Sequence, residues 1–452
     1  MSEPKKVFFA QNTCINASYD VNVLREGFRR AGYVLADSAE DADEVVFSGC
    51  GAHQTWVNDA INQINRIASV SPNAKVTVTG CLAGIDADRV RRSVTHEALA
   101  FAPQQEVLKS HTGIDFDEID RNYDQESALD YEGSTEFNQL RIRVGTEKAA
   151  VVAELQKFDR EYGLDLEKYY RQTTKGFVFY QENEAVDMIT VTRSCPYKCS
   201  FCAIPQGRGD YTSVPLDVVV EKVRASLRRG TRRVVLLGDE VGNYGSDLHG
   251  PRIKDLLEAI LALDPELRVS LRYVEPKPFL KNFPMFERLC GEGRIELLYL
   301  PLQSGSQKIL MAMNRGYQLD RIVPLYRQLR ETTDTIFFCN WLVGFPGETD
   351  EDFGATRMLM SDLGLQINTA VPYSERPNTP APHMPCKIPE SVKEQRLIDL
   401  RGTIAEMKRR EFDLRMEPVA PNRRQHVLDL IAAAECIHVD DFASGASDVA
   451  SA

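Results

Sequence analysis

Short apolar runs alternate with segments of helical apolar spacing across the first ninety residues. The runs KVFFAQNTC, DEVVFSGC and AKVTVTGC have the length and composition of buried strands. After the first run, Val21, Leu24 and Phe28 recur at helical spacing, and a second such series follows the middle run. Strands that alternate with helices are typical of a parallel sheet with right-handed crossovers. The pattern therefore predicts an α/β domain over residues 1–95.

The same alternation resumes near residue 181 and continues to about residue 412. Amphipathic helical segments lie between the apolar runs of this part, and one of them ends at Gly230. The runs that we interpret as strands are VDMITVTR, RRVVLLGD, RVSLRYV, IELLYLPL, TIFFCNWLVGF and LQINTAVPY. Six such units favour an incomplete (β/α) barrel over residues 181–412 rather than an open sheet.

The remaining segments lack this alternation. Residues 96–180 contain an acidic stretch, 113–137, that is rich in turn formers, so we interpret the region as an insert or linker. A helical piece, KAAVVAELQKFDREYG, follows the acidic stretch. Residues 413–452 combine a helical extension with the tail FASGASDVASA, whose composition is that of a disordered segment.

Composition and charge limit the classes of function. The chain of 452 residues is long enough for two or three domains, and its hydrophobic content of 43% is ordinary for a soluble protein. No run approaches the roughly 20 apolar residues of a membrane span, and the first apolar run is too short for a signal peptide. We therefore expect a cytoplasmic protein with no membrane partner. A net charge of −12 argues against a general nucleic-acid coat. The basic runs at 228–233 and 408–410 are interpreted as solvated helix ends.

Three of the ten cysteines are closely spaced in the segment TRSCPYKCSFCAIPQGRG. Cys195, Cys199 and Cys202 follow a predicted strand, and clustered thiols in a reducing compartment indicate a metal site or catalysis. Zinc requires a fourth ligand, usually with its own close partner, and no second Cys-x2-Cys or histidine pair follows. Three thiolates suit a cubane iron–sulfur cluster, which leaves one iron open to a small chelating molecule.

A second set of three cysteines ends the three strands of the first domain. Cys14, Cys50 and Cys81 each follow an apolar run, and the carboxyl ends of parallel strands meet at one edge of a sheet. We therefore expect these thiols to share a ligand, although three unrelated buried thiols are the alternative. The other four, Cys290, Cys339, Cys386 and Cys436, have no partner spacing, and Cys290 and Cys339 are interpreted as small buried hydrophobes.

The ordered motifs resemble the radical S-adenosylmethionine (SAM) methylthiotransferases. CSFCAIPQGRG is similar to the cluster loop of that family, and LLGDEVGNYGSD to the motif after its second strand. Further similar segments are YLPLQSGSQKILMAMNRGY, WLVGFPGETDEDF and YSERPNTPAP. The resemblance covers residues 6–90 and 188–385. It implies a Rossmann-like domain with an auxiliary cluster, followed by a partial (β/α)6 TIM-like radical SAM barrel.

The resemblance also implies the chemistry. In the family, one [4Fe-4S] cluster binds and cleaves SAM to a 5′-deoxyadenosyl radical, and a second [4Fe-4S] cluster carries the sulfur. One SAM methylates that sulfur, and a second SAM generates the substrate radical that takes up the methylthio group. An electron donor such as flavodoxin or ferredoxin is the expected partner.

Site residues follow from the resemblance at the matching positions. Cys195, Cys199 and Cys202 are expected to ligate the SAM cluster, and Cys14, Cys50 and Cys81 the auxiliary cluster. The expected SAM or substrate contacts are Tyr197, Phe201, Gly238, Glu240, Gln303, Ser304, Arg315, Gly344 and Phe345. No catalytic residue is assigned beyond the cluster ligands.

Three departures from the family bear on the substrate. The region after the barrel lacks the alternating strands of the family's RNA-gripping TRAM domain, the segment between the two cysteine sets is long, and Asp239, Glu240 and Glu275 replace side chains that are common in the family. With the negative charge, these features favour a peptide, carrier-bound or small-molecule substrate over transfer RNA. The alternatives are a tRNA methylthiotransferase, sulfur insertion or other radical chemistry without methylation, and a non-catalytic iron–sulfur protein.

Overall fold

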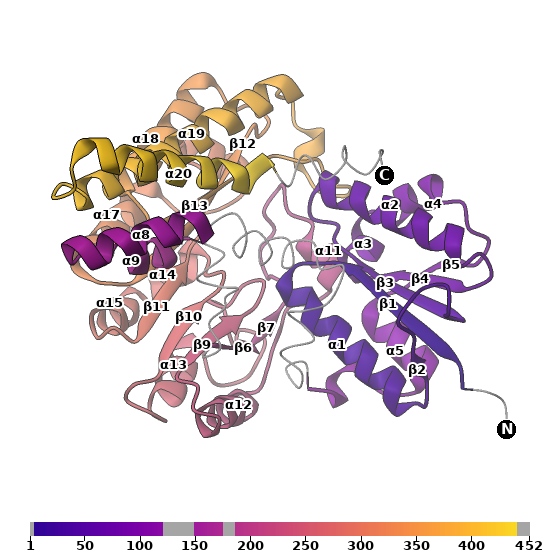
Figure 1. Cartoon of the computed structure of the whole chain (residues 1–452). Helices are drawn as coiled ribbons and strands as arrows, with labels where there is room; N and C mark the ends of the chain where they lie inside the picture. The colour runs from indigo at the N-terminus through magenta and orange to yellow at the C-terminus, as the bar shows by residue number, and fades with distance from the viewer. Residues whose placement is uncertain (1–3, 121–148, 175–185, 441–452) are drawn as a thin grey trace.

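The structure, a computed structural model, describes residues 4–120, 149–174 and 186–440. Two α/β domains stand side by side in Figure 1, the amino-terminal one in indigo and the larger one in pink and orange. The predicted fold class, a parallel-sheet domain followed by a partial barrel, is confirmed by the two sheets described next. No helix in the described part of the chain is long and apolar enough to cross a membrane.

The amino-terminal domain is a five-stranded parallel sheet in the order β2-β1-β3-β4-β5. Its strands are β1 (Lys6–Asn12), β2 (Val34–Leu35), β3 (Glu44–Gly49), β4 (Lys75–Thr79) and β5 (Leu99–Phe101). Helices α1 (Ile15–Arg30) and α5 (Gln104–Thr112) pack on one face, and α2 (Gln54–Val70) and α4 (Ala87–Ser93) on the other. Two apolar clusters, one on each face, hold the layers together because both faces of a parallel sheet must be covered. The sheet and its helices extend past residue 95 to Thr112.

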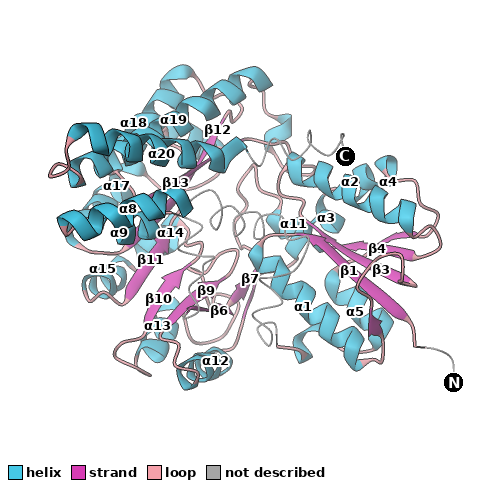
Figure 2. Ribbon diagram, in the orientation of Figure 1, coloured by secondary structure: helices cyan, strands magenta, loops and turns pink. Residues whose placement is uncertain are grey.

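The second sheet has six parallel strands in the order β13-β12-β11-β10-β9-β6. They are β6 (Val186–Thr190), β9 (Arg233–Leu237), β10 (Arg268–Leu271), β11 (Ile295–Tyr299), β12 (Ile336–Val343) and β13 (Ile367–Pro372), one for each predicted run. The covering helices are α12 (Leu216–Arg228), α13 (Ile253–Leu261), α14 (Pro276–Lys281), α15 (Phe283–Gly291), α16 (Gln307–Ala312), α17 (Leu319–Thr332) and α18 (Asp350–Leu363). Figure 2 shows these helices outside the strands, as in a barrel that is not closed.

The two domains share an apolar cluster on the inner side of the six-stranded sheet. Ile15 and Tyr19, at the start of α1, pack with Leu237, Tyr299 and Phe338 of the barrel strands. The rings of Tyr299 and Phe338 are stacked with centroids 3.8 Å apart. Each such buried side chain contributes about 1.5–3 kcal/mol. The start of α1 therefore packs against the inner side of the barrel strands, in addition to the contacts of α1 within its own domain.

A helical module covers one side of the barrel and joins two distant parts of the chain. Helices α8 (Ala149–Tyr162) and α9 (Leu166–Thr173) pack with α19 (Glu390–Arg415) and α20 (Pro421–Asp440) around one apolar cluster. In Figure 1 the purple α8 and α9 lie beneath the yellow α20. Residues 149–174 of the expected linker are thus packed structure, because the apolar stripe of α8 has a partner. Most of the acidic stretch 113–137 and the tail 441–452 lie outside the described residues.

Candidate functional site: two sets of cysteines

The first set of cysteines lies at one edge of the amino-terminal sheet. Cys14 precedes the first residue of α1, Cys50 follows β3, and Cys81 lies in α3 (Gly80–Ile85) directly after β4. Strands β1, β3 and β4 are neighbours in the sheet, so their carboxyl ends are adjacent. The side chain of Asn12 accepts a hydrogen bond from the Cys50 backbone N–H at 3.0 Å and donates to the Trp56 carbonyl at 2.8 Å. The amide of Asn12 thereby fixes the turn that carries Cys50.

The second set lies on the loop after the short strand β7 (Thr192–Arg193), which pairs with β8 (Thr212–Ser213). Ser200 fastens this loop to the end of α16 through its backbone N–H to Met313 at 3.0 Å and its hydroxyl to Ala312 at 2.8 Å. Asn314 donates to the Lys198 carbonyl at 2.8 Å. These bonds hold Cys199 in a buried position with Cys195 and Cys202 on either side of it.

Each sulfur of this second set has a hydrogen-bond donor beside it. Burial raises the pKa of the Cys195, Cys199 and Cys202 thiols, that of Cys202 to about 12, whereas the backbone N–H groups of Tyr197 and Ile204 oppose the shift at Cys195 and Cys202. The Arg315 guanidinium, with Nη1 3.6 Å from the Cys199 Sγ, likewise opposes the rise of the Cys199 pKa. Donors aimed at sulfur are typical of thiolates that ligate iron–sulfur clusters.

The donor set fits an iron–sulfur cluster in both places. Within residues 4–120, 149–174 and 186–440, none of these six cysteines forms a disulfide, and no group of three Cys, His, Asp or Glu side chains is arranged to hold a single metal ion. Three thiols in each place match the soft sulfur set of a cluster. The assignment of these two sets as the cluster ligands stays a prediction from the sequence.

The loops of the two sets abut. Helix α11 (Ile204–Arg208), which follows Cys202, packs on α3, which carries Cys81. A Cβ on Gly207 would stand 2.8 Å from the Cys81 Cα, and one on Gly84 would stand 2.4 Å from the Gln206 carbonyl oxygen. Only glycine allows backbone to approach backbone this closely. The close approach places the two sets on adjoining segments, although they come from different domains.

Glu240, one of the expected SAM or substrate contacts, follows β9. Its side chain is fully buried and accepts backbone N–H bonds from Gly242 at 2.8 Å, Asn243 at 2.7 Å and Glu275 at 3.1 Å. Burial raises the pKa of this carboxyl to about 7, in spite of those bonds. A Cβ on Gly238 would meet the Thr192 hydroxyl at 1.9 Å. Glu240 and Gly238 therefore shape the loop beside Cys195, and their contact with SAM stays a prediction.

Tyr197 and Phe201, predicted near the adenine, flank the buried Cys199. The Tyr197 hydroxyl accepts a hydrogen bond from Asn243 at 2.8 Å, and the Lys277 ammonium lies 5.3 Å from the Tyr197 ring centroid. Phe201 is partly buried against the main core of the barrel. Both rings thus help to hold the cysteine loop, and a direct contact with SAM remains to be tested.

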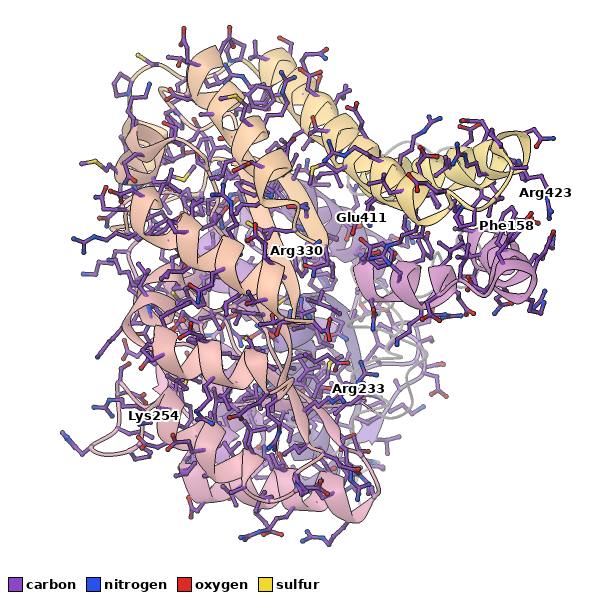
Figure 3. All side chains as sticks on the ribbon, turned by 90° about the vertical axis from the view of Figure 1, so that its left-hand side faces the viewer. Phe158, Arg233, Lys254, Arg330, Glu411 and Arg423 are labelled. Atoms are coloured by element: carbon purple, nitrogen blue, oxygen red, sulfur yellow. The ribbon has the colours of Figure 1, made fainter. Side chains whose placement is uncertain are left out.

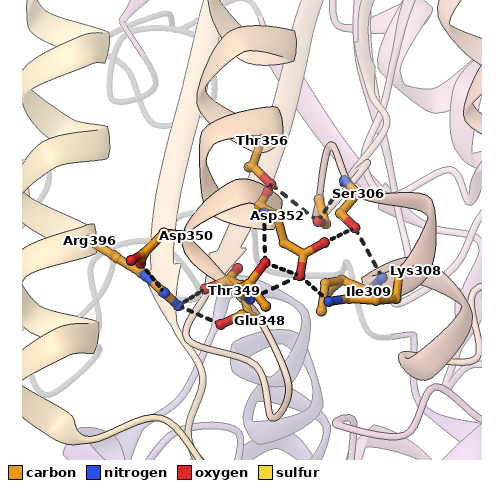
Figure 4. Close-up of polar contacts among 10 residues, drawn as sticks. Ser306, Lys308, Ile309, Glu348, Thr349, Asp350, Asp352, Thr356 and Arg396 are labelled. Atoms are coloured by element: carbon orange, nitrogen blue, oxygen red, sulfur yellow. Dashed lines mark hydrogen bonds and ion pairs between the residues drawn. The ribbon is translucent and has the colours of Figure 1, made fainter.

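Ser304 and Gln303 occupy the turn after β11, where Figure 4 draws a polar network. The Ser304 hydroxyl is 3.2 Å from that of Thr356, and Ser306 donates to Asp352 at 2.6 Å. These bonds fasten the turn to α18, so the contacts of Ser304 are internal. Gln303 is buried with a φ of 72°, a strained backbone for a residue other than glycine. Such strain is concentrated at functional sites, which makes Gln303 the stronger candidate for a ligand contact.

Arg315, another of the expected SAM or substrate contacts, is buried and has three polar partners. Its Nη1 donates to the Glu275 carboxylate at 2.5 Å as well as to Cys199, and its Nη2 donates to the Pro301 carbonyl at 2.6 Å. Burial raises the pKa of Glu275 despite this partner. Arg315 thus links a sulfur of the cysteine set to a buried carboxylate, and Glu275 supplies the charge that the sequence flagged as unusual.

Gly344 and Phe345 follow β12. Gly344 has a φ of 76°, and a Cβ there would stand 2.4 Å from the Lys393 side chain of α19. The Phe345 ring is fully buried with its centroid 5.5 Å from that of Tyr373. The side chain that approaches Gly344 closely thus comes from α19. The contact of Gly344 and Phe345 with SAM or substrate stays a prediction.

Sequence reasoning missed two buried arginines. Arg208 closes the motif CSFCAIPQGRG, and Arg376 lies within YSERPNTPAP. Both side chains contact the amino-terminal domain. Their position inside the motifs already quoted was the available signal, because a basic residue in a largely apolar loop needs a buried partner.

Comparisons with known proteins agree with this architecture. Residues 189–360 match the Radical SAM superfamily, and residues 6–102 match uncharacterized protein family UPF0004. The chain is 27% identical over 413 residues to tRNA-2-methylthio-N(6)-dimethylallyladenosine synthase of Vibrio parahaemolyticus, covering 88% of this chain and 77% of that protein. It is 29% identical to the protein of the same name from Cereibacter sphaeroides, covering 90% and 85%.

A solved structure with a similar fold is the radical SAM methyltransferase TsrM of Kitasatospora setae. Its TM-score is 0.52 at 16% identity, covering 84% of this chain and 74% of TsrM. At that identity the likeness concerns the fold alone.

The barrel, its cysteine loop and the superfamily match define a radical SAM enzyme. The preceding domain, with its own three cysteines, matches uncharacterized protein family UPF0004. Together the two matches and the relatives support a member of the radical SAM methylthiotransferase family, a transferase whose cofactors are SAM and two [4Fe-4S] clusters.

Proposed function

We propose that this protein transfers a methylthio group to a carbon of its substrate, converting C–H to C–SCH3. The observation that carries the proposal is the abutment of the two cysteine loops through Gly207 and Cys81. When bound, the clusters supply the electron that cleaves SAM and the sulfur that is transferred. Because the two clusters would be held on adjoining segments, the substrate radical would form near the sulfur donor. The transfer would then be effectively intramolecular.

The side chains of the barrel have supporting parts in this proposal. Glu240, near Cys195, offers a buried carboxylate toward an ammonium group, which suits the amino group of SAM. Arg315 donates to a cluster thiolate and to Glu275, and so fixes the Cys199 loop. Both groups are buried, and in a site with little water their electrostatic effects are stronger than they would be in bulk solvent.

The first candidate substrate is an adenosine of transfer RNA. Relatives that cover about nine-tenths of this chain carry the name of a tRNA-modifying synthase, which supports tRNA over the substrate classes that the sequence favoured. The acceptor in this proposal is a C–H of the modified base. The hydrogen leaves with the 5′-deoxyadenosyl group as 5′-deoxyadenosine, and the methylthio group takes its place.

A peptide, carrier-bound or small-molecule substrate is the second candidate, and the helical module favours it. Arg423, labelled at the outer end of the module in Figure 3, pairs with Glu161 at 2.6 Å, and Arg424 pairs with Asp413 at 3.4 Å. Phosphate binding depends on basic side chains that are available to the nucleic acid. Basic side chains already paired with carboxylates offer less of that attraction, which supports an acceptor without a phosphate backbone.

The test uses the full chain with both clusters reconstituted, dithionite, and SAM labelled in its methyl group. Bulk tRNA that lacks the methylthio group and a set of peptides are incubated separately, and the products are analysed by mass spectrometry. A labelled gain of one sulfur and one methyl group on tRNA supports the first candidate, and the same gain on a peptide supports the second. A product that gains sulfur without label, or formation of 5′-deoxyadenosine with no sulfur in any substrate, would contradict methylthio transfer.

A further inference from the structure

Two buried arginines of the barrel domain cross into the amino-terminal domain, one at each side of its cysteine set. Arg208 ends α11 and is 5% exposed, and Arg376 follows β13 and is 2% exposed. Long cationic side chains are almost never fully buried unless they are paired. The hydrogen-bond and ion-pair partners of each arginine therefore show which segments it connects.

Arg208 is held between two carboxylates from different domains. Its Nε donates to Asp239 of the barrel at 3.0 Å, and its Nη1 forms an ion pair with Asp20 of α1. Asp239 in turn accepts from the Ser194 N–H at 2.8 Å and from Asn16 of α1 at 3.2 Å. One connected polar network thus joins the residue before Cys195 to the helix that begins after Cys14.

Arg208 also lies beside the thiols of the first set. Burial raises the pKa of the Cys81 thiol to about 12, and the guanidinium of Arg208 is the strongest influence in the opposite direction. Cys14 and Cys81 both act on the pKa of Arg208, which is raised well above its usual value by Asp20, Asp239 and these two sulfurs against the effect of burial. Gly207, the residue before Arg208, abuts the Cys81 backbone, and Asp20 lies on the helix that begins after Cys14, so the cation lies on the side of these two cysteines.

Arg376 makes the corresponding contacts at the third cysteine. Its Nη1 donates to the carbonyl of Gly51, the residue after Cys50, at 3.2 Å, and its Nη2 donates to the Gln54 side chain at 2.8 Å. Asp86, which follows the Cys81 helix, is 3.8 Å from Nη1. The Arg376 Nε is buried without a hydrogen-bond partner in the described part of the chain. The side chain thus ties the Cys50 turn and the end of α3 to the barrel.

We propose that Arg208 and Arg376 are the positioning residues that fix the auxiliary cysteine set against the SAM-cluster loop, Arg208 at Cys14 and Cys81 and Arg376 at the Cys50 turn. This inference rests on the proposed function, in which the two sets must keep a fixed separation. Each arginine acts by neutralising charge and by binding backbone and side-chain oxygens of the neighbouring domain.

Removing either arginine leaves buried groups without their partner. In an Arg208→Gln variant, Asp20 and Asp239 lose their shared cation, and the two carboxylates, one from each domain, repel each other. In an Arg376→Gln variant, the Gly51 carbonyl and the Gln54 side chain lose their donor. Both changes loosen the auxiliary set relative to the barrel and leave Cys195, Cys199 and Cys202 with their own hydrogen bonds.

The test compares Arg208→Gln, Arg376→Gln and Arg376→Lys with the control Arg294→Gln. Arg294 is a half-buried arginine that donates to the carbonyls of Leu267, Leu261 and Asp264, far along the chain from both cysteine sets. The first measurement is amide hydrogen exchange of the apo chain in segments 48–56 and 80–88. We expect faster exchange in both glutamine variants at these segments, a smaller change in the lysine variant, and the wild-type pattern there in the control.

The second set of measurements uses the enzyme with both clusters reconstituted. It quantifies 5′-deoxyadenosine and the methylthio product, and it determines the reduction potential of the auxiliary cluster. We expect 5′-deoxyadenosine formation within about 2-fold of wild type, and the ratio of methylthio product to 5′-deoxyadenosine lower by about 10- to 100-fold, the effect of a displacement near 1 Å. The reduction potential of the auxiliary cluster is expected to fall in Arg208→Gln, because an anionic cluster loses a nearby cation.

The outcomes separate this inference from the proposed function. Wild-type exchange, ratio and potential in both glutamine variants would overturn the positioning role. If the wild type makes no methylthio product, the proposed function is rejected. Faster amide exchange and a lower reduction potential of the auxiliary cluster in the variants would still support the positioning role. If Arg376→Gln does not fold, Arg376→Lys keeps the charge and loses the paired donors, so its exchange at 48–56 decides the question.

Discussion

Gly207 lies so close to Cys81 that a Cβ on the glycine would stand 2.8 Å from the Cys81 Cα and 2.9 Å from its Cβ. The glycine belongs to the helix after the SAM-cluster loop, and the cysteine belongs to the auxiliary set. Since the obstructing atoms belong to the backbone or are directly attached to it, no rotation of a side chain would make room. The separation of the two cysteine sets is therefore determined by a contact between main chains.

A Gly207→Ala substitution is expected to force α11 and α3 apart. We expect a loss of about 1–3 kcal/mol of unfolding free energy, as for other overpacked sites, with a lower yield of methylthio product per 5′-deoxyadenosine. Urea unfolding of the apo chain measures the first quantity. Gly402→Ala in α19 is the matched control, because nothing lies within 4 Å of its Cβ position and alanine is favoured in a helix by about 1 kcal/mol. Wild-type stability and product yield in Gly207→Ala would show that the contact is unimportant.

The iron content of the reconstituted chain is expected to divide between the two cysteine sets. Replacing Cys14, Cys50 and Cys81 together with alanine should reduce the content from about eight irons per chain to about four, and leave a cluster that still cleaves SAM. Replacing Cys195, Cys199 and Cys202 should remove the other four and abolish 5′-deoxyadenosine formation. Cys339→Ala, at a fully buried thiol in the barrel core, should retain about eight irons. Equal iron loss in the two triple variants and in Cys339→Ala would contradict this division.

The Arg315–Glu275 pair is expected to stabilise the apo barrel only as a pair. Arg315→Gln leaves Glu275 as an uncompensated buried carboxylate near the buried Glu240, which typically costs about 3 kcal/mol. In the double variant Arg315→Gln/Glu275→Gln the buried charge is absent, so we expect part of that loss to be recovered. Chemical unfolding of four apo chains, wild type, Arg315→Gln, Glu275→Gln and the double variant, gives the coupling free energy. An additive double variant would mean that the two side chains do not interact.

Acid sensitivity of the amino-terminal domain is expected to involve Glu44. A hydrogen bond from His111 is the largest effect that lowers the Glu44 pKa from 4.5 to about 2, with Lys5 adding to it and burial opposing it. Since the folded pKa is lowered, the stabilisation is complete above pH 4.5 and is lost as the pH falls from 4.5 to 2. It amounts to about 2–3 kcal/mol. Tyr33 is the other titratable group close enough to affect Lys5 and to be affected by Glu44.

The measurement is the urea midpoint of the apo chain at pH 7, 4 and 3. Glu44→Gln should lower the midpoint at pH 7 and flatten its decline between pH 4.5 and 3. Glu351→Gln, at an exposed position in the first turn of α18, is the control and should follow the wild-type decline. A decline in Glu44→Gln as steep as in wild type would assign the acid sensitivity to other groups.

The main strands and the cysteine positions were predictable because each has a local signal. A buried parallel strand is a short apolar run, and Cys14, Cys50 and Cys81 each follow one, so chain order alone puts them at a sheet edge. The Arg208–Asp20 pair had no such signal, since 188 positions separate the two residues and only the tertiary fold brings them together. The packing of α8 against α20 was missed for the same reason. Short β2 and β5 were missed because two or three residues show no periodicity.

The helical module has a consequence for how the chain is made. Helix α8 begins at Ala149, but α20, which covers its apolar side, begins at Pro421, 272 residues later. At about 5–20 residues per second, the ribosome needs tens of seconds to synthesise that interval. During this time the apolar side chains of Val151, Leu155 and Phe158 lack their final cover, which makes them a natural binding site for a chaperone. Helix α8 therefore completes its packing only after α20 has been synthesised.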